Sequence, residues 1–222
     1  MLSSLIHQVR ITSPFRMRND LHLVRKAWHI ATGLAGLLFY YNTNFSMQFV
    51  ASVLLIFSLA AFAVEFLRLK NEKLNIILMS VMRPFMRESE RTSVSGLPFY
   101  ALGTGLTLML FPERVAILSV LFLIFADPIA SVIGILYGKD KILPNKSLQG
   151  TLAAFTVCYV ITMIYGMRFS NPDMNLLCFS LLAGVVGSFS ELCSRYIDDN
   201  LSIPVISGTI LYLINTYWIN VF

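Results

Sequence analysis

The feature that most constrains this chain is a series of seven apolar segments, each about as long as a bilayer-spanning helix. They cover residues 24–41, 45–67, 94–111, 115–137, 148–167, 176–197 and 203–222. Charged residues make up 13% of the 222 residues, whereas a soluble domain has about 25%. Too little charge remains to cover a soluble globule. The sequence therefore predicts an all-α, polytopic membrane protein with about seven transmembrane segments.

Two stretches outside these segments have a different character. Residues 1–22 combine a short amphipathic run with three arginines, which favours an interfacial N-terminal segment. Residues 70–92 mix apolar and charged side chains and are predicted to form an amphipathic connection on the cytoplasmic membrane surface. No internal repeat or low-complexity linker appears, so residues 1–222 are expected to form a single integral membrane domain.

The basic residues orient the chain. With the N-terminus inside, fifteen of the 17 Lys and Arg residues fall on the inner side, and only Arg114 and Arg168 fall outside. The positive-inside rule therefore predicts a cytoplasmic N-terminus. The net charge of +5 is best explained by anionic lipid headgroups, and no nucleic-acid partner is expected.

Asp127 is the sharpest functional candidate, because ionisable side chains inside a membrane segment are costly. The apolar run before it, residues 115–126, is too short to cross about 30 Å of hydrocarbon. Pro128 follows at once and removes a backbone donor. We therefore expect this span to be broken near Asp127–Pro128, with Asp127 lining a polar cavity as metal ligand or base. A structural carboxylate paired with a basic residue is the alternative.

Five other ionisable residues lie near the ends of apolar segments. Arg25, Lys26 and His29 share one face of the first helix, which suits phosphate binding. A snorkelling anchor and a helix-end histidine are the structural alternatives. Glu65 and Glu191 each lie about two turns or less from the same surface, where they could orient a basic side chain or serve only the structure.

Two polar clusters complete the candidate set. Asp198, Asp199 and Asn200 supply the oxygen ligands that magnesium shares with phosphates, although this segment could simply end one helix and cap the next, with Asn200 or Ser202 as N-cap. A second cluster follows the fourth segment and combines glycines with lysines, which allows phosphate to approach the backbone closely. It comprises Gly134, Gly138, Lys139, Lys146, Ser147 and Gly150. It is not a Walker A loop, and a flexible basic loop explains it equally well.

All these features map to the predicted cytoplasmic half, as a metal–nucleotide site acting on a lipid headgroup would require. In order and spacing they resemble the CTP-dependent lipid kinases, a family that includes dolichol kinase, phytol kinase and fungal diacylglycerol kinase. The resemblance covers residues 24–210, and the runs RLKNEKLN, NKSLQGTLAAF and DDNLSIPV resemble the diacylglycerol kinase branch most. Ser147 stands where this family commonly has threonine.

The resemblance implies transfer of the γ-phosphate of CTP to a lipid hydroxyl with Mg²⁺, and diacylglycerol as acceptor. On that basis the catalytic residues are expected to be Asp127, Asp199 and Lys146. The metal ligands are expected among Asp127, Asp198, Asp199 and Glu191. The nucleotide is expected to contact Arg25, Lys26, His29, Gly134, Gly138, Lys139, Lys146, Ser147, Gly150 and Asn200. We expect Asp127 to accept the hydroxyl proton.

Three alternatives remain open at this point. The acceptor could be an isoprenoid alcohol such as a polyprenol, dolichol or phytol. The enzyme could be a CTP:phosphatidate cytidylyltransferase, which attacks the α-phosphate. The chain could also be a small transporter, since broken spans with acidic residues occur there too. The preference for CTP over ATP rests on the resemblance alone, and the oligomeric state is left open.

Overall fold

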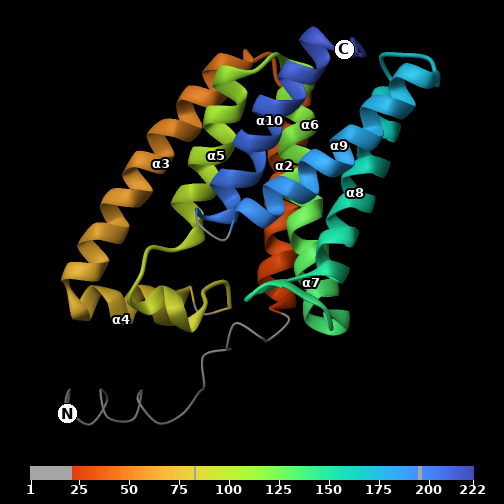
Figure 1. Cartoon of the computed structure of the whole chain (residues 1–222). Helices are drawn as coiled ribbons and strands as arrows, with labels where there is room; N and C mark the ends of the chain where they lie inside the picture. The colour runs from red at the N-terminus through yellow and green to blue at the C-terminus, as the bar shows by residue number, and fades with distance from the viewer. Residues whose placement is uncertain (1–21, 83, 195–196) are drawn as a thin grey trace.

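The computed structural model describes residues 22–82, 84–194 and 197–222, so the predicted interfacial segment lies almost entirely outside the described part. The described helices are α2 (Leu23–Asn42), α3 (Met47–Lys70), α4 (Glu72–Val81), α5 (Gly96–Leu110), α6 (Glu113–Leu121), α7 (Asp127–Tyr137), α8 (Leu148–Gly166), α9 (Met174–Cys193) and α10 (Asp199–Tyr217) (Figure 1). Shorter elements are the 3₁₀ turn η1 (Glu88–Arg91), the π-helical turn η2 (Phe122–Ala126) and the strands β1 (Lys141–Leu143) and β2 (Lys146–Ser147). The all-α prediction is confirmed.

Four of the expected spans meet the length and hydropathy of a membrane-crossing helix. They are α3, the continuous unit Glu113–Tyr137, α8 and α9. On α3 the side chain of Leu59 is 69% exposed, as expected of a side chain that faces lipid. Helices α2, α5 and α10 occupy the other three predicted segments, and their role as spans stays a prediction. Helix α4 runs along one end of the bundle (Figure 1), where the amphipathic connection was expected.

The predicted break near Asp127–Pro128 is wrong, because the backbone stays helical through this region. Instead, the π-helical turn η2 joins α6 directly to α7, which begins at Asp127. A π turn pairs residue i with i+5, so the missing N–H of Pro128 leaves the carbonyl of Leu123 without its helical donor. The wider turn thus accommodates the proline without breaking the span.

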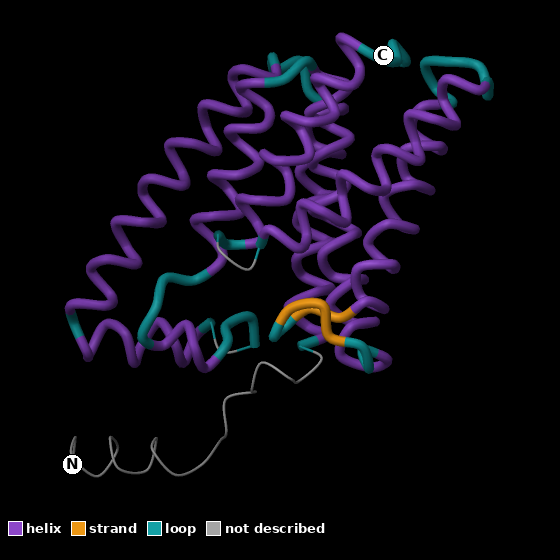
Figure 2. The backbone as a smooth tube through the Cα atoms, in the orientation of Figure 1, coloured by secondary structure: helices purple, strands orange, loops and turns teal. Residues whose placement is uncertain are grey.

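Small residues set the packing of the bundle. Helix α10 packs against α5, α6 and α9, and glycines allow the close approach. A Cβ at Gly103 would collide with the backbone of Asn200, and one at Gly187 would collide with Cys158. The N-termini of α5 and α10 therefore meet inside the bundle, deeper than α4 and the β1–β2 hairpin (Figure 2). This recess places the polar start of α10 within the helical layer.

Candidate active site

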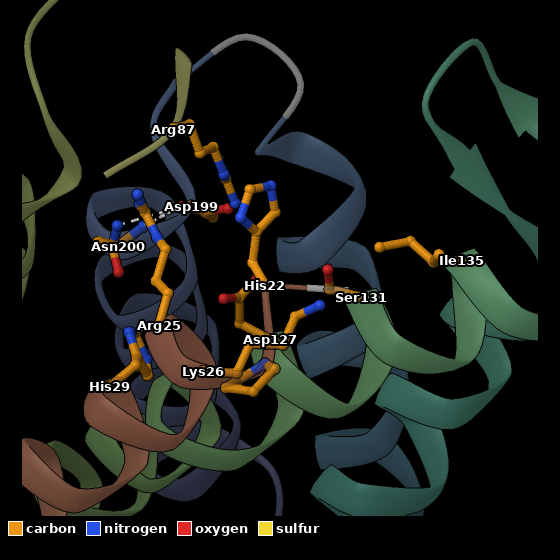
Figure 3. A pocket seen from close by; sticks show the side chains of 11 residues that line it. His22, Arg25, Lys26, His29, Arg87, Asp127, Ser131, Ile135, Asp199 and Asn200 are labelled. Atoms are coloured by element: carbon orange, nitrogen blue, oxygen red, sulfur yellow. Dashed lines mark hydrogen bonds between the residues drawn. The ribbon is translucent and has the colours of Figure 1, made fainter. Parts of the chain in front are cut away.

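A charged pocket lies where α2, α7, α10 and the segment before η1 meet (Figure 3). It is lined by His22, Arg25, Lys26, His29, Arg87, Asp127, Pro128, Ser131, Ile135, Asp199 and Asn200. Its free volume is about 30 Å³, which is small beside that of typical ligand pockets. We call this cavity the charged pocket.

Helix α2 supplies the basic wall of the pocket, as its helical spacing predicted. Arg25 Nη1 donates to Glu90 Oε1 (2.6 Å) and to the carbonyl of Phe85 (3.2 Å), which ties α2 to the chain around η1. His29 Nε2 lies 3.0 Å from the carbonyl oxygen of Leu123, which is the carbonyl released by Pro128. Because a carbonyl can only accept, Nε2 carries the proton.

Two carboxylates form the opposite wall. Asp127 begins α7 and Asp199 begins α10, and residues 72 positions apart thereby reach one cavity. Arg87 and Lys146 lie close enough to act electrostatically on both carboxylates. Arg87 Nε is buried and has no hydrogen-bond partner within the described parts of the chain. Figure 3 shows the Arg87 side chain directed toward Asp199.

Asp198 has a different position from its neighbour. It does not line the charged pocket but caps α10, accepting from the Asn200 backbone N–H (3.0 Å) and side-chain Nδ2 (2.8 Å). Burial, and then the adjacent carboxylate of Asp199, raise the pKa of Asp198 to about 6. The segment therefore caps the next helix as the structural alternative proposed, but the N-cap is Asp198 and not Asn200 or Ser202.

Lys146 and Glu191 form a largely buried ion pair that joins β2 to α9. Neither residue lines the charged pocket, although Lys146 acts on its carboxylates from the rim. Glu191 Oε2 is buried and finds no hydrogen-bond partner among the residues the structure describes. Glu191 therefore positions Lys146 rather than contributing to the pocket wall.

The glycine-rich cluster packs two helices together. A Cβ at Gly134 would lie 3.2 Å from Ser147 Oγ, and one at Gly150 would lie 2.9 Å from the carbonyl oxygen of Ala130. Ser147 Oγ accepts from the N–H of Gly150 (3.2 Å) and so caps α8. None of these groups lines the charged pocket.

Two further residues of that cluster bear on the predicted nucleotide contacts. Gly138 lies against Gly134 and Ser147, and Lys139 is exposed at the end of α7. The close backbone approach that was predicted for phosphate is thus used by α7 and α8.

The predicted four-carboxylate metal set is not preassembled. No group of three or more His, Cys, Asp or Glu side chains lies close enough to hold a metal ion in residues 22–82, 84–194 and 197–222. Asp127 and Asp199 alone line the pocket, whereas Asp198 caps α10 and Glu191 pairs with Lys146. Magnesium commonly uses one or two carboxylates plus substrate phosphates, so this donor set fits a metal shared with a nucleotide.

Glu65 and Arg68 build the end of the bundle next to the pocket. Arg68 is 1% exposed and donates to both oxygens of Glu65. It also donates to Asn75 Oδ1 (2.8 Å) and to the carbonyl of Glu90 (3.0 Å). This network holds α4 and η1 against α3, so the predicted role of Glu65 in orienting Arg68 agrees with the geometry.

Sequence reasoning missed the importance of Arg87 and Glu90. Both belong to the amphipathic connection, where the sequence offers charges without a period that points to α2. Arg87 was counted only as one of the residues that orient the chain. The one available signal was the density of charge between residues 87 and 91, which also suits an exposed loop.

Comparisons with known proteins bear on this site. Residues 15–197 match the Cytidylyltransferase family. The chain is 35% identical over 206 residues to the CTP-dependent diacylglycerol kinase 1 of Schizosaccharomyces pombe, covering 86% of this chain and 92% of that protein. It is 29% identical over 204 residues to the Saccharomyces cerevisiae protein of the same name, covering 83% and 70%. No solved structure is significantly similar. The chain therefore belongs to the Cytidylyltransferase family, within which it groups with the CTP-dependent diacylglycerol kinases.

Proposed function

We propose that this protein is a CTP-dependent lipid kinase that transfers the γ-phosphate of CTP to the hydroxyl of diacylglycerol, giving phosphatidic acid. The observation that carries the proposal is the charged pocket, in which the carboxylates of α7 and α10 face basic side chains of α2 and of the segment before η1. Phosphoryl transfer is mostly positioning and charge stabilisation, and this pocket has the groups for both. The curated relatives named as CTP-dependent diacylglycerol kinases support the same nucleotide and acceptor.

The triphosphate binds against Arg25, Lys26 and Arg87, with Lys146 at the rim. The buried, unpaired Nε of Arg87 is a donor that a phosphate oxygen would satisfy. Mg²⁺, held by Asp127 and Asp199, would neutralise charge on the phosphate oxygens when bound. His29 Nε2 donates a hydrogen bond to the carbonyl of Leu123, and this bond fixes the imidazole ring beside Arg25.

The chemical step is a single displacement. The lipid oxygen forms a bond to the γ-phosphorus as the bond from that phosphorus to the β,γ-bridging oxygen breaks, and CDP leaves. The hydroxyl proton passes to Asp127, whose side chain lines the charged pocket. No covalent enzyme intermediate forms. Asp199, toward which the Arg87 side chain is directed, holds the nucleotide end of the site (Figure 3).

We further propose that residues 1–222 form one multi-pass membrane domain with the charged pocket on the cytoplasmic side. The asymmetry of basic residues supports this orientation, since 15 of the 17 Lys and Arg residues fall in the sequence segments that the predicted topology assigns to the inner side. A transporter would need polar groups along both halves of the bundle. The ionisable lining residues found here gather at one end, around the N-termini of α2, α7 and α10.

Labelled CTP tests the function. Detergent-purified protein is incubated with magnesium and α- or γ-labelled CTP, and with diacylglycerol, phosphatidic acid, phytol or a polyprenol in separate reactions. We expect label from the γ-position alone, on diacylglycerol, and loss of the product when magnesium is chelated. Label from the α-position on phosphatidic acid would instead identify a cytidylyltransferase. Preferential labelling of phytol or polyprenol would assign an isoprenoid alcohol kinase.

A further inference from the structure

A second, larger cavity adjoins the charged pocket. It has a volume of about 270 Å³ and lies between α2, α3, α4 and α5. Its lining that is not shared with the charged pocket comprises Trp28, Thr32, Val64, Glu65, Arg68, Leu78, Met82, Phe85, Met86, Glu90, Ser95, Gly96, Leu97 and Tyr100. We call this cavity the apolar chamber, because aromatic, aliphatic and methionine side chains dominate its walls.

The two cavities share one wall. Arg25, His29 and Asn200 line both, so a molecule in the apolar chamber could place one end against the charged pocket. Gly96 keeps this wall thin, since a Cβ there would lie 2.8 Å from Arg25 Nη2 and 2.9 Å from Asn200 Nδ2. The chamber therefore lies directly against the charged pocket, with Arg25, His29 and Asn200 between the two cavities.

The chamber has solvent-accessible apolar walls. Three of its lining residues are about half exposed, namely Trp28 (52%), Val64 (48%) and Leu97 (47%). Exposed apolar side chains on membrane helices face hydrocarbon, so an acyl chain could pass between them without meeting water. Helix α4 closes the end of the chamber and is fixed there by the Arg68 network.

The chamber also borders an aromatic ring that packs on His29. Tyr100 lines the chamber and lies edge-on against His29, with ring centroids 4.7 Å apart. Its Oη is buried and lies toward α2, since a Cβ at Gly33 would be 2.5 Å from it. The chamber therefore meets the ring of Tyr100 and not its hydroxyl group.

We propose that the apolar chamber is the acceptor-lipid site, in which diacylglycerol lies with its acyl chains among the apolar walls and its free hydroxyl at the wall of Arg25, His29 and Asn200. This inference rests on the proposed function for the direction of the hydroxyl. The occupancy of the chamber by a glycerolipid is a separate claim, which can be measured without turnover.

Photolabelling tests occupancy. The full chain in detergent is irradiated with a diacylglycerol that has a diazirine near the glycerol end of one acyl chain, with or without excess dioctanoylglycerol. We expect labelling of Met82, Met86 or Leu97 that the competitor removes, and any labelling of Leu59 on the outer face of α3 to persist. Labelling that dioctanoylglycerol does not displace from the chamber would overturn the proposal, whether or not the enzyme transfers phosphate.

Kinetics tests the position of the lipid. We expect Leu97→Trp, which narrows the chamber, to raise the KM for diacylglycerol at least about tenfold and to leave the KM for CTP unchanged. Leu59→Trp, on the exposed face of α3, is the matched control and should change neither. An unchanged KM for diacylglycerol in the Leu97→Trp variant would contradict this position of the lipid.

The two proposals fail in different ways. Absence of γ-phosphate transfer by the wild-type chain, together with displaceable labelling of the chamber, would refute the kinase function and support the lipid site. Transfer to diacylglycerol without displaceable labelling of the chamber would support the kinase function and refute the lipid site.

Discussion

Two regions of this protein carry the same kinds of residue and use them differently. The charged pocket gathers basic side chains of α2 opposite Asp127 and Asp199, whereas the α7–hairpin–α8 region combines glycines with lysines. In the first, the side chains face a cavity. In the second, the glycines face each other and the helices fill the space. Glycine beside lysine is therefore weak evidence for phosphate binding, because close helix packing needs the same glycines.

Among the variants that test this difference between the two regions, Asp127→Asn should reduce activity most. The amide keeps the size of the side chain but cannot accept the hydroxyl proton, so we expect turnover to fall about 10²- to 10³-fold. The thermal midpoint should stay close to that of the wild type. Asp140→Asn, in the exposed hairpin region, is the control and should be fully active. A fully active Asp127→Asn enzyme would remove Asp127 from the mechanism.

Lys146 joins the two regions, and a pair of variants separates its two roles. Lys146→Met leaves Glu191 buried without its partner, which should cost about 3 kcal/mol of stability. Activity should fall at least about tenfold, because a cation beside the triphosphate is lost. Adding Glu191→Gln should restore the denaturation midpoint but not the activity. Recovery of activity in the double variant would show that Lys146 serves only the structure.

Gly138→Ala tests the packing role of the second region. The new methyl group would collide with the carbonyl oxygen of Gly134, so we expect a loss of about 1–3 kcal/mol in the free energy of unfolding. The KM for CTP of the folded enzyme should not change. Gly36→Ala, where the methyl group meets nothing within 4 Å, is the matched control for the substitution itself. A changed KM for CTP with unchanged stability would instead support the predicted contact between Gly138 and the nucleotide.

Lys139→Ala should have the smallest effect. The side chain is exposed at the end of α7 and lies outside the charged pocket, so we expect the KM for CTP to stay within about twofold of the wild-type value. Steady-state kinetics at low ionic strength gives the most sensitive measurement. A tenfold rise would mean that the hairpin moves over the nucleotide and that the two regions form one site.

Much of this architecture could be predicted from local patterns. Hydropathy located the helices, and the face formed by Arg25, Lys26 and His29 was read from helical spacing alone. Asp127 was placed in a cavity for a sound reason, its cost in an apolar segment. These properties depend on residues within one or two helical turns of each other, so they can be predicted from short stretches of sequence.

Contacts between distant segments could not be predicted in this way. Nothing near Glu90 indicates that it binds Arg25, 65 residues earlier, and nothing near Asp198 shows that its partners are backbone and amide groups of its own turn. The π-helical turn also has no sequence pattern distinct from a break, because proline removes the same donor in both. Only tertiary packing decides between them.

The hydrogen bond from His29 to the carbonyl of Leu123 has a consequence for biogenesis. The two residues are 94 positions apart, so the first described helix leaves the ribosome long before its partner exists. Asp199 and Asn200, which close the charged pocket, are synthesised later still. During insertion the basic face of α2 therefore lacks these partners until α10 has been synthesised, and lipid headgroups or the insertion machinery must solvate it until then. Assembly of the pocket is a late event, and a chain truncated before α10 would insert its early helices without acquiring a site.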